Sequence, residues 1–97
     1  MTEQQYQKKI SDNLTEDGYF VTNLIKTNRN GIPDLLALKI NEPPMYVECK
    51  TLKGKLSKIQ EFRLDELTGY GFNCYVSYGM ALKKWKIKDK KNCEYGF

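Results

Sequence analysis

The chain has 97 residues, enough for one compact domain, and no apolar run approaches the ~20 residues needed to span a bilayer. It contains no histidine, which excludes Ser-His-Asp and Cys-His nucleophilic sites, His-bound zinc and nucleases with a histidine general base. The net charge is +4, and residues 80–97 account for it with six lysines against two acids: Lys83, Lys84, Lys86, Lys88, Lys90 and Lys91, Asp89 and Glu94. This basic C-terminal segment indicates a polyanionic partner, with a solvated terminus as the alternative.

The first predicted element is a helix that begins after Thr2, since Gln5 stands three residues further on and completes a capping box. Apolar residues then recur at i, i+4 and i+8 and form one buried stripe: Tyr6, Ile10 and Leu14. Gly18 ends the helix, because glycine readily adopts the conformation that closes a helix. Residues 19–26 (YFVTNLIK) follow as a strand.

A hairpin is predicted next. Turn residues at 28–33 (NRNGIP) lead into a second strand over residues 34–40 (DLLALKI). The two prolines of residues 41–44 (NEPP) require a loop, and a third strand spans residues 45–51 (MYVECKT). Because this loop is short, the second and third strands are expected to pair antiparallel.

The second half of the chain alternates again between helix and strand. A helix is predicted from Ser57 to about Thr68, and a fourth strand over residues 73–78 (NCYVSY). Trp85 and Ile87 alternate with lysines, which suits an edge strand, with a helix as the alternative. The order helix, three strands, helix, strand predicts an α/β fold.

The cysteines and the N-terminus indicate the compartment. Cys49, Cys74 and Cys93 form no CxxC pair, so a zinc ribbon or knuckle is not expected. Two of the three lie in strand-like runs and are expected to be buried thiols. The N-terminal residues MTEQQYQKKI lack the apolar region of a signal peptide, so we expect the protein in a cytoplasm, that of the host for a viral protein.

The predicted hairpin brings two acidic residues and a lysine to one place. If its loop is centred on residues 41–42, Asp34 lies opposite Glu48 or Lys50, and the latter two share a face because they are two apart. A register error of one residue would separate the groups. The alternatives are a turn role for Asp34 and ordinary exposed strand charges for Glu48 and Lys50.

This grouping has a definite chemistry. Two carboxylates and an ammonium at one point of a central sheet are costly unless a function uses them. Mg²⁺ binds one or two carboxylates, polarises a phosphate and lowers the pKa of a bound water. A nearby lysine can orient or deprotonate that water and offset charge on the phosphate. These are the parts that phosphodiester hydrolysis needs, and none of them is a histidine.

Five features occur in a defined order: Glu3, GIPD at 31–34, ECK at 48–50, KGKLS at 53–57 and Gln60. Together they resemble the VRR-NUC (virus-type replication-repair nuclease) family of the PD-(D/E)XK nuclease superfamily, in its stand-alone viral form, over roughly residues 1–79. The resemblance implies a restriction-endonuclease-like core (α-β-β-β-α-β), with a central mixed sheet flanked by helices. It also implies Mg²⁺ or Mn²⁺ held by Asp34, Glu48 and the backbone carbonyl of Cys49.

Further residues are assigned to the site, each with an alternative. Glu3 lies on the buried stripe of the first helix and is expected near the metal, or else it is a first-turn acid favoured by the helix dipole. Gln60 is expected to point at the site, or else to complete a capping box with Ser57. Four basic residues are candidates for DNA phosphate contacts, or else plain surface charge: Lys53, Lys55, Lys58 and Arg63.

The expected function is that of a metal-dependent DNA endonuclease with catalytic residues Asp34, Glu48, Lys50, Glu3 and Gln60. The resemblance implies branched DNA as substrate, a Holliday junction or flap, and a homodimer without membrane association. Residues 1–97 are expected to form one nuclease domain that includes the basic segment 80–97. The alternatives are a nucleic-acid-binding module with a degenerate site, or an interaction protein without a nucleic-acid role.

Overall fold

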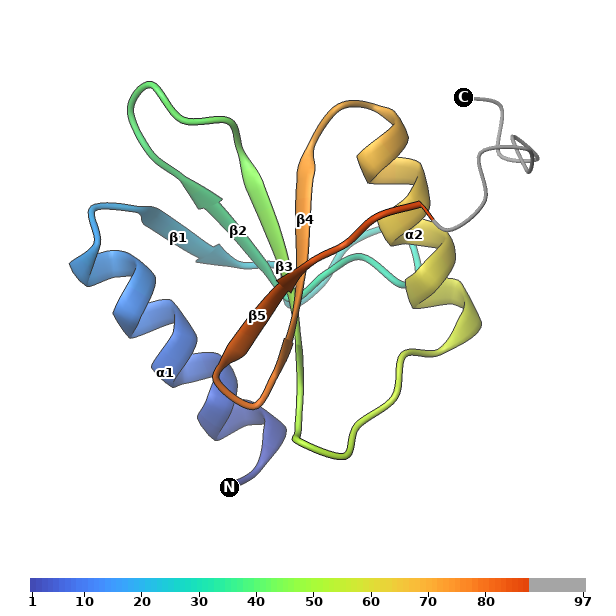
Figure 1. The fold of residues 1–97 in the computed structure, drawn as a ribbon, viewed down its shortest axis with the longest axis horizontal. Helices are drawn as coiled ribbons and strands as arrows, with labels where there is room; N and C mark the ends of the chain where they lie inside the picture. Colours follow the sequence, from blue (N-terminus) through green and yellow to red (C-terminus); the bar gives the residue numbers. More distant parts are fainter. Residues whose placement is uncertain (88–97) are drawn as a thin grey trace.

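A five-stranded sheet forms the middle layer of the molecule, with one helix packed on each face (Figure 1). The computed structural model describes residues 1–87. Its elements follow the chain as α1 (Glu3–Glu16), β1 (Phe20–Asn23), β2 (Leu35–Leu38), β3 (Met45–Lys50), α2 (Lys58–Gly69), β4 (Asn73–Tyr78) and β5 (Ala81–Lys84). The predicted α/β fold, with a mixed sheet flanked by helices, is confirmed.

The strands lie in the order β1-β2-β3-β4-β5, which is also their order along the chain. The first three form an antiparallel meander, α2 carries the chain from β3 to its parallel neighbour β4, and β5 returns antiparallel at the edge. Leu35 pairs with Val47 in the β2–β3 hairpin, so Asp34 stands opposite Glu48 just beyond the last paired residues. The predicted antiparallel hairpin is confirmed, with Glu48 rather than Lys50 opposite Asp34.

Both helices begin where the capping boxes predict. The backbone N–H of Gln5 donates to the Thr2 hydroxyl, and the N–H of Thr2 donates to the Gln5 side-chain oxygen. Ser57 and Gln60 make the same reciprocal pair at the start of α2. Each box satisfies two backbone amides that a helix leaves without an internal partner. After α1, Gly18 adopts a φ of +94°, the left-handed conformation that closes the helix.

The side chains of β3 point alternately to the two faces of the sheet. On the α1 face the buried side chains are Ile10, Leu35, Ala37, Met45, Val47 and Cys49. On the α2 face they are Leu64, Cys74 and Val76, with Tyr46 of β3 half-buried against them. The expected burial of two cysteines is therefore confirmed for Cys49 and Cys74, while Cys93 lies outside the described residues.

The strands of the meander are shorter than predicted. β1 covers Phe20–Asn23 rather than residues 19–26. The N–H of Leu24 donates once more toward β2, to the carbonyl of Asp34, and residues 24–27 then have no regular structure. β2 ends at Leu38 rather than at residue 40, because Asn41 takes a positive φ of 64° in the turn to β3. After both β1 and β2 the loop therefore begins earlier along the chain than the apolar pattern of the sequence indicates.

The region after β4 contains an edge strand, but it covers Ala81–Lys84 and does not include Trp85 and Ile87, from which an edge strand or a helix was predicted. β5 ends at Lys84, and Trp85 leaves the strand to pack against the core under α2, where its Nε1 donates to Asp65 at 2.7 Å. Lys88, Lys90 and Lys91 of the basic segment lie outside the described residues. No helix within residues 1–87 has the length and apolar character needed to cross a membrane.

Candidate active site

Asp34 sits where β2 and β3 part. The β2–β3 pairing ends at Leu35 and Val47, so the N–H of Cys49 on β3 has no partner on β2. The Asp34 carboxylate occupies that position, and its Oδ2 accepts the Cys49 N–H at 2.8 Å. Because the N–H and C=O of one strand residue point the same way, the carbonyl of Cys49 also faces this opening. The backbone thus orients Asp34 and directs a carbonyl oxygen toward the same place.

The turn before Asp34 is pressed against the start of α2. Gly31 has a φ of +79°, and a Cβ there would stand 2.6 Å from the carbonyl oxygen of Ile59, so only glycine fits. Arg63 of α2 reaches back to the same turn, and its Nε donates to the carbonyl of Asn30 at 2.7 Å. These contacts fix the turn that carries Asp34. Gly31 was not predicted to have a structural role. A glycine two residues before a proline is, however, a sequence signal for a tight turn.

Glu48 is a buried carboxylate on the α2 face of the sheet, with a relative exposure of 2%. Gln60 of α2 donates through Nε2 to its Oε2 at 3.3 Å. The Nζ of Lys50 lies 4.0 Å from the same oxygen, and the Lys50 side chain is 12% exposed. The E-x-K spacing therefore places acid and ammonium side by side, and α2 covers them.

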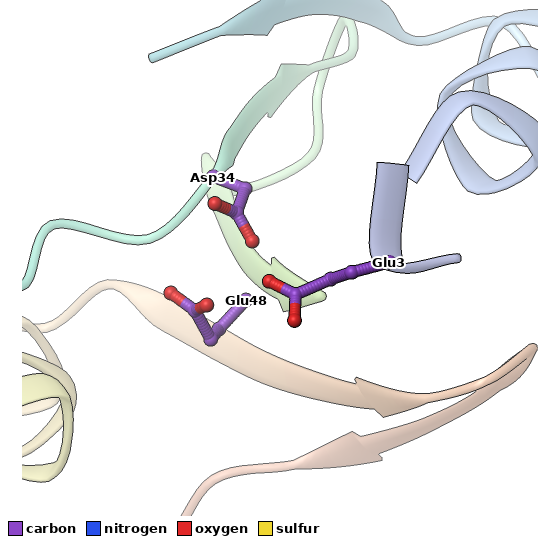
Figure 2. Close-up of side chains that lie close together, drawn as sticks. All are labelled: Glu3, Asp34 and Glu48. Atoms are coloured by element: carbon purple, nitrogen blue, oxygen red, sulfur yellow. The ribbon is translucent and has the colours of Figure 1, made fainter. Parts of the chain in front are cut away.

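Glu3 completes an acidic cluster from the opposite side of the sheet. It stands at the first position of α1, on an exposed turn, yet its side chain extends toward Asp34 and Glu48 (Figure 2). One carboxylate oxygen from each of the three residues lies within 4.8 Å of the others. The start of α1 thus meets the end of the β2–β3 hairpin at a single point.

The cluster is electrostatically strained in the absence of a cation. Burial, together with the negative charge of Asp34, raises the pKa of Glu48 to about 9, and Lys50 only partly opposes this. Burial and the same carboxylates raise the pKa of the Cys49 thiol to about 12. Cys49 is therefore a neutral thiol, and the oxygen ligand that it can offer is its backbone carbonyl.

The donor set fits a hard divalent cation. Carboxylate and carbonyl oxygens are the ligands that Mg²⁺ and Mn²⁺ accept, and a cation would offset the repulsion that raises the pKa of Glu48. Asp34, Glu48 and Glu3 would supply carboxylates, and Cys49 its carbonyl. Lys50 supplies a positive charge beside Glu48 that is available to a substrate phosphate or a water.

Gln60 was expected either to point at the site or to complete a capping box, and in the structure it does both. Its Oε1 accepts the N–H of Ser57 in the capping box, while its Nε2 donates to Glu48. An amide can do this because its two ends are an acceptor and a donor. Gln60 thus holds the orientation of Glu48 from a position fixed by the helix start.

The four residues expected to contact DNA divide into two groups. Lys53, Lys55 and Lys58 are exposed, on the loop after β3 and at the start of α2. Arg63 instead holds the protein together, since besides Asn30 it pairs with Glu66 at 2.8 Å and its side chain is 12% exposed. A phosphate contact by Arg63 would have to compete with both partners.

Comparison with models of known protein families gave a match. The family model of the VRR-NUC domain matches residues 1–81, which include every member of the cluster and the whole of β1 to β4. A search of the curated proteins found no match, and neither did a search of the solved structures. The family match covers more than half of the chain, and the chain therefore belongs to the VRR-NUC domain family, a family of nucleases.

Proposed function

We propose that this protein is a metal-dependent DNA endonuclease that hydrolyses phosphodiester bonds in branched DNA. The observation that carries the proposal is the meeting of Glu3, Asp34 and Glu48 within 4.8 Å, beside the ammonium of Lys50. The family match supports the nuclease part of the proposal. The proposed cation is Mg²⁺ or Mn²⁺, both of which bind the oxygen ligands that the site offers.

The chain's own residues prepare the site. The Cys49 N–H holds Asp34, and the Gln60 amide holds Glu48, so both carboxylates keep a defined orientation. Lys50 orients the attacking water and offsets the negative charge that builds on the phosphate during hydrolysis. A bound divalent cation would polarise the scissile phosphate and lower the pKa of a bound water.

Substrate binding follows from the surface around the site. Lys53, Lys55 and Lys58 are exposed on the segment that leads from β3 into α2, where their charges can meet DNA phosphates. Residues 1–97 form one nuclease domain, and the basic segment 80–97 adds to the same electrostatic attraction. A domain of this size gains grip on a branched substrate, a Holliday junction or a flap, by acting as a homodimer with two sites.

One assay tests the proposal. Four-way, flap, nicked, single-stranded and linear duplex DNAs are incubated with protein in Mg²⁺, Mn²⁺ or EDTA. Cleavage of branched DNA that requires the metal is expected. Chelator-insensitive DNA binding with no cleavage of any substrate would instead support a non-catalytic binding module.

Variants test the assignment of residues. Asp34→Ala and Lys50→Ala should each lower cleavage by about 10²–10⁴-fold. Asp34→Asn is the necessary companion, because it keeps an oxygen for the Cys49 N–H while it removes the charge. Lys39→Ala is the control, since Lys39 pairs with Asp17 away from the cluster. Robust cleavage by Asp34→Asn and Lys50→Ala, with circular dichroism showing intact folds, would refute the site.

A further inference from the structure

A pocket of about 640 Å³ opens beside the carboxylate cluster, between α1 and the chain that leaves β1. Asp34 forms part of its wall, so the pocket borders the proposed active site. Its other lining residues are Gln4, Gln7, Lys8, Ser11, Asp12, Asn23, Leu24 and Ile25. The volume is within the range of about 300–1,000 Å³ found for pockets that bind small organic groups.

The polar lining consists largely of uncharged side chains with unused hydrogen-bonding groups. Gln4, Gln7 and Ser11 lie at i, i+3 and i+7 of α1 and therefore form one stripe. Among residues 1–87, the side-chain amides of Gln4, Gln7 and Asn23 make no hydrogen bond. Gln5, in the same helical turn, uses its amide oxygen in the helix cap. The pocket thus concentrates amides that are free to bind a ligand.

The charges of the pocket exclude a phosphate as its natural occupant. Lys8 and Asp12 pair with each other at 3.0 Å, so their charges largely cancel. The other charge on the wall is that of Asp34, so the lining offers no unpaired cation to a phosphate. A neutral group that carries both donors and acceptors fits this wall better.

An apolar edge completes the pocket. Leu24 and Ile25 line it, and Ile25 is 86% exposed, so a flat ring could cover its side chain. The exposed lysines at positions 53, 55 and 58 lie on a separate segment, after β3. The lysines that could bind phosphates are therefore not part of the pocket lining.

We propose that this pocket holds one unpaired nucleobase of the substrate strand, on a nucleotide next to the scissile phosphate. The proposal rests on the nuclease function proposed above. The amides of Gln4, Gln7 and Asn23 bind the base edge, and Leu24 and Ile25 contact the ring. A base can enter only after it leaves its stack, which costs least where it is already unpaired. The pocket thereby gives a physical basis for preference for branch points and flaps over continuous duplex.

Abasic substrates test this inference. A flap DNA is prepared with one abasic nucleotide at each position around the cleavage site in turn, and kcat/KM is measured in Mg²⁺. For the wild-type protein, one position next to the cut should show a loss of about tenfold, the size expected for one lost base contact. Gln7→Ala should lower kcat/KM on the intact flap by a similar factor and show no further loss on that abasic flap, because the two changes remove the same contact.

Asn13→Ala is the matched control, an amide removed from the same helix outside the pocket. It should behave as wild type on both substrates. An equal abasic loss in wild type and Gln7→Ala, or no sensitive position at all, overturns the inference while cleavage itself still supports the nuclease proposal.

A binding measurement keeps the inference testable even without cleavage. A 2-aminopurine placed at each position of the flap in turn is titrated with protein in EDTA. Its fluorescence should change on binding of wild type and of Asn13→Ala at one position, and much less with Gln7→Ala. Identical signals from wild type and Gln7→Ala at every position overturn the base pocket whether or not the DNA is cut.

Discussion

The first turns of α1 and α2 are built alike and used differently. Each follows a hydroxyl side chain that caps the helix, and each carries a glutamine at the third position that completes a capping box. Each also has an acid in its first turn, Glu3 in α1 and Glu61 in α2. In α1 the acid enters the carboxylate cluster, whereas in α2 the glutamine, Gln60, contacts the cluster and Glu61 is not part of it.

This difference separates what a local pattern controls from what the packing controls. The capping box sets where a helix begins, which is the same outcome in both places. Which side chain then reaches the site depends on the face of the sheet from which the helix approaches. The two helix starts also bring their partial positive charges toward the carboxylates, worth about 0.3–1 kcal/mol each.

The largest effect is expected from removing the acid that α1 and α2 both approach. Glu48→Gln keeps the size of the side chain and loses the negative charge, so cleavage should fall by about 10²–10⁴-fold. Metal binding measured by isothermal titration should weaken in parallel. A variant that cleaves branched DNA at the wild-type rate would show that the shared target of the two helices is not a metal ligand.

The raised pKa of Glu48 predicts that the stability of the protein depends on pH. The folded chain holds a proton on Glu48 up to a pKa of about 9, whereas the unfolded chain releases it above the ordinary value of 4.5. This contribution is therefore fully present below about pH 4.5 and is lost as the pH rises toward 9, by up to about 1.4 kcal/mol per pH unit. In EDTA, the Tm of the wild-type protein should fall across this range more steeply than that of Glu48→Gln. Parallel Tm profiles would contradict the raised pKa.

The two first-turn acids, Glu3 and Glu61, should differ in their contribution to cleavage. Glu3→Gln should lower cleavage by about 10–100-fold, the scale for a group that supports a metal site. Glu61→Gln is the matched variant, and it should leave cleavage nearly unchanged. Glu61→Gln should lose about 0.3–1 kcal/mol of stability, because Glu61 faces a helix dipole. In Glu3→Gln the relief of repulsion with Glu48 should offset that loss. Equal activity in the two variants would reduce Glu3 to that dipole role.

The smallest effect on cleavage is expected for the glutamines of the two capping boxes, Gln5 and Gln60. Gln5→Ala and Gln60→Ala each remove one hydrogen bond of a capping box, so each should lose about 0.5–1.5 kcal/mol in urea unfolding. Gln60→Ala should also lower cleavage by about tenfold, because Glu48 loses a hydrogen bond that orients it. An equal loss of cleavage in both variants would mean that only the helix start matters.

The central part of the site could be predicted because it depends on short-range spacing. The E-x-K pair and the antiparallel hairpin require only the alternation of a strand and a short loop, and the pairing places Glu48, one of the two predicted partners, opposite Asp34. The burial of Glu48 could not be predicted in this way, because it depends on α2 folding back over β3. Arg63 likewise carried no local signal for its contact with Asn30, a residue 33 positions away. Both the burial of Glu48 and the contact of Arg63 depend on tertiary packing, which local sequence patterns do not show.

The position of Asp34 at the parting of two strands has a consequence for how the chain tolerates change. The site lies at one end of the β2–β3 hairpin, and the loop of residues 39–44 lies at the other end (Figure 1). Insertions in that loop leave the pairing of Leu35 with Val47 intact, whereas a one-residue insertion within β2 would turn Asp34 to the opposite face. The loop is thus the natural place for a label or fused domain that leaves the site undisturbed.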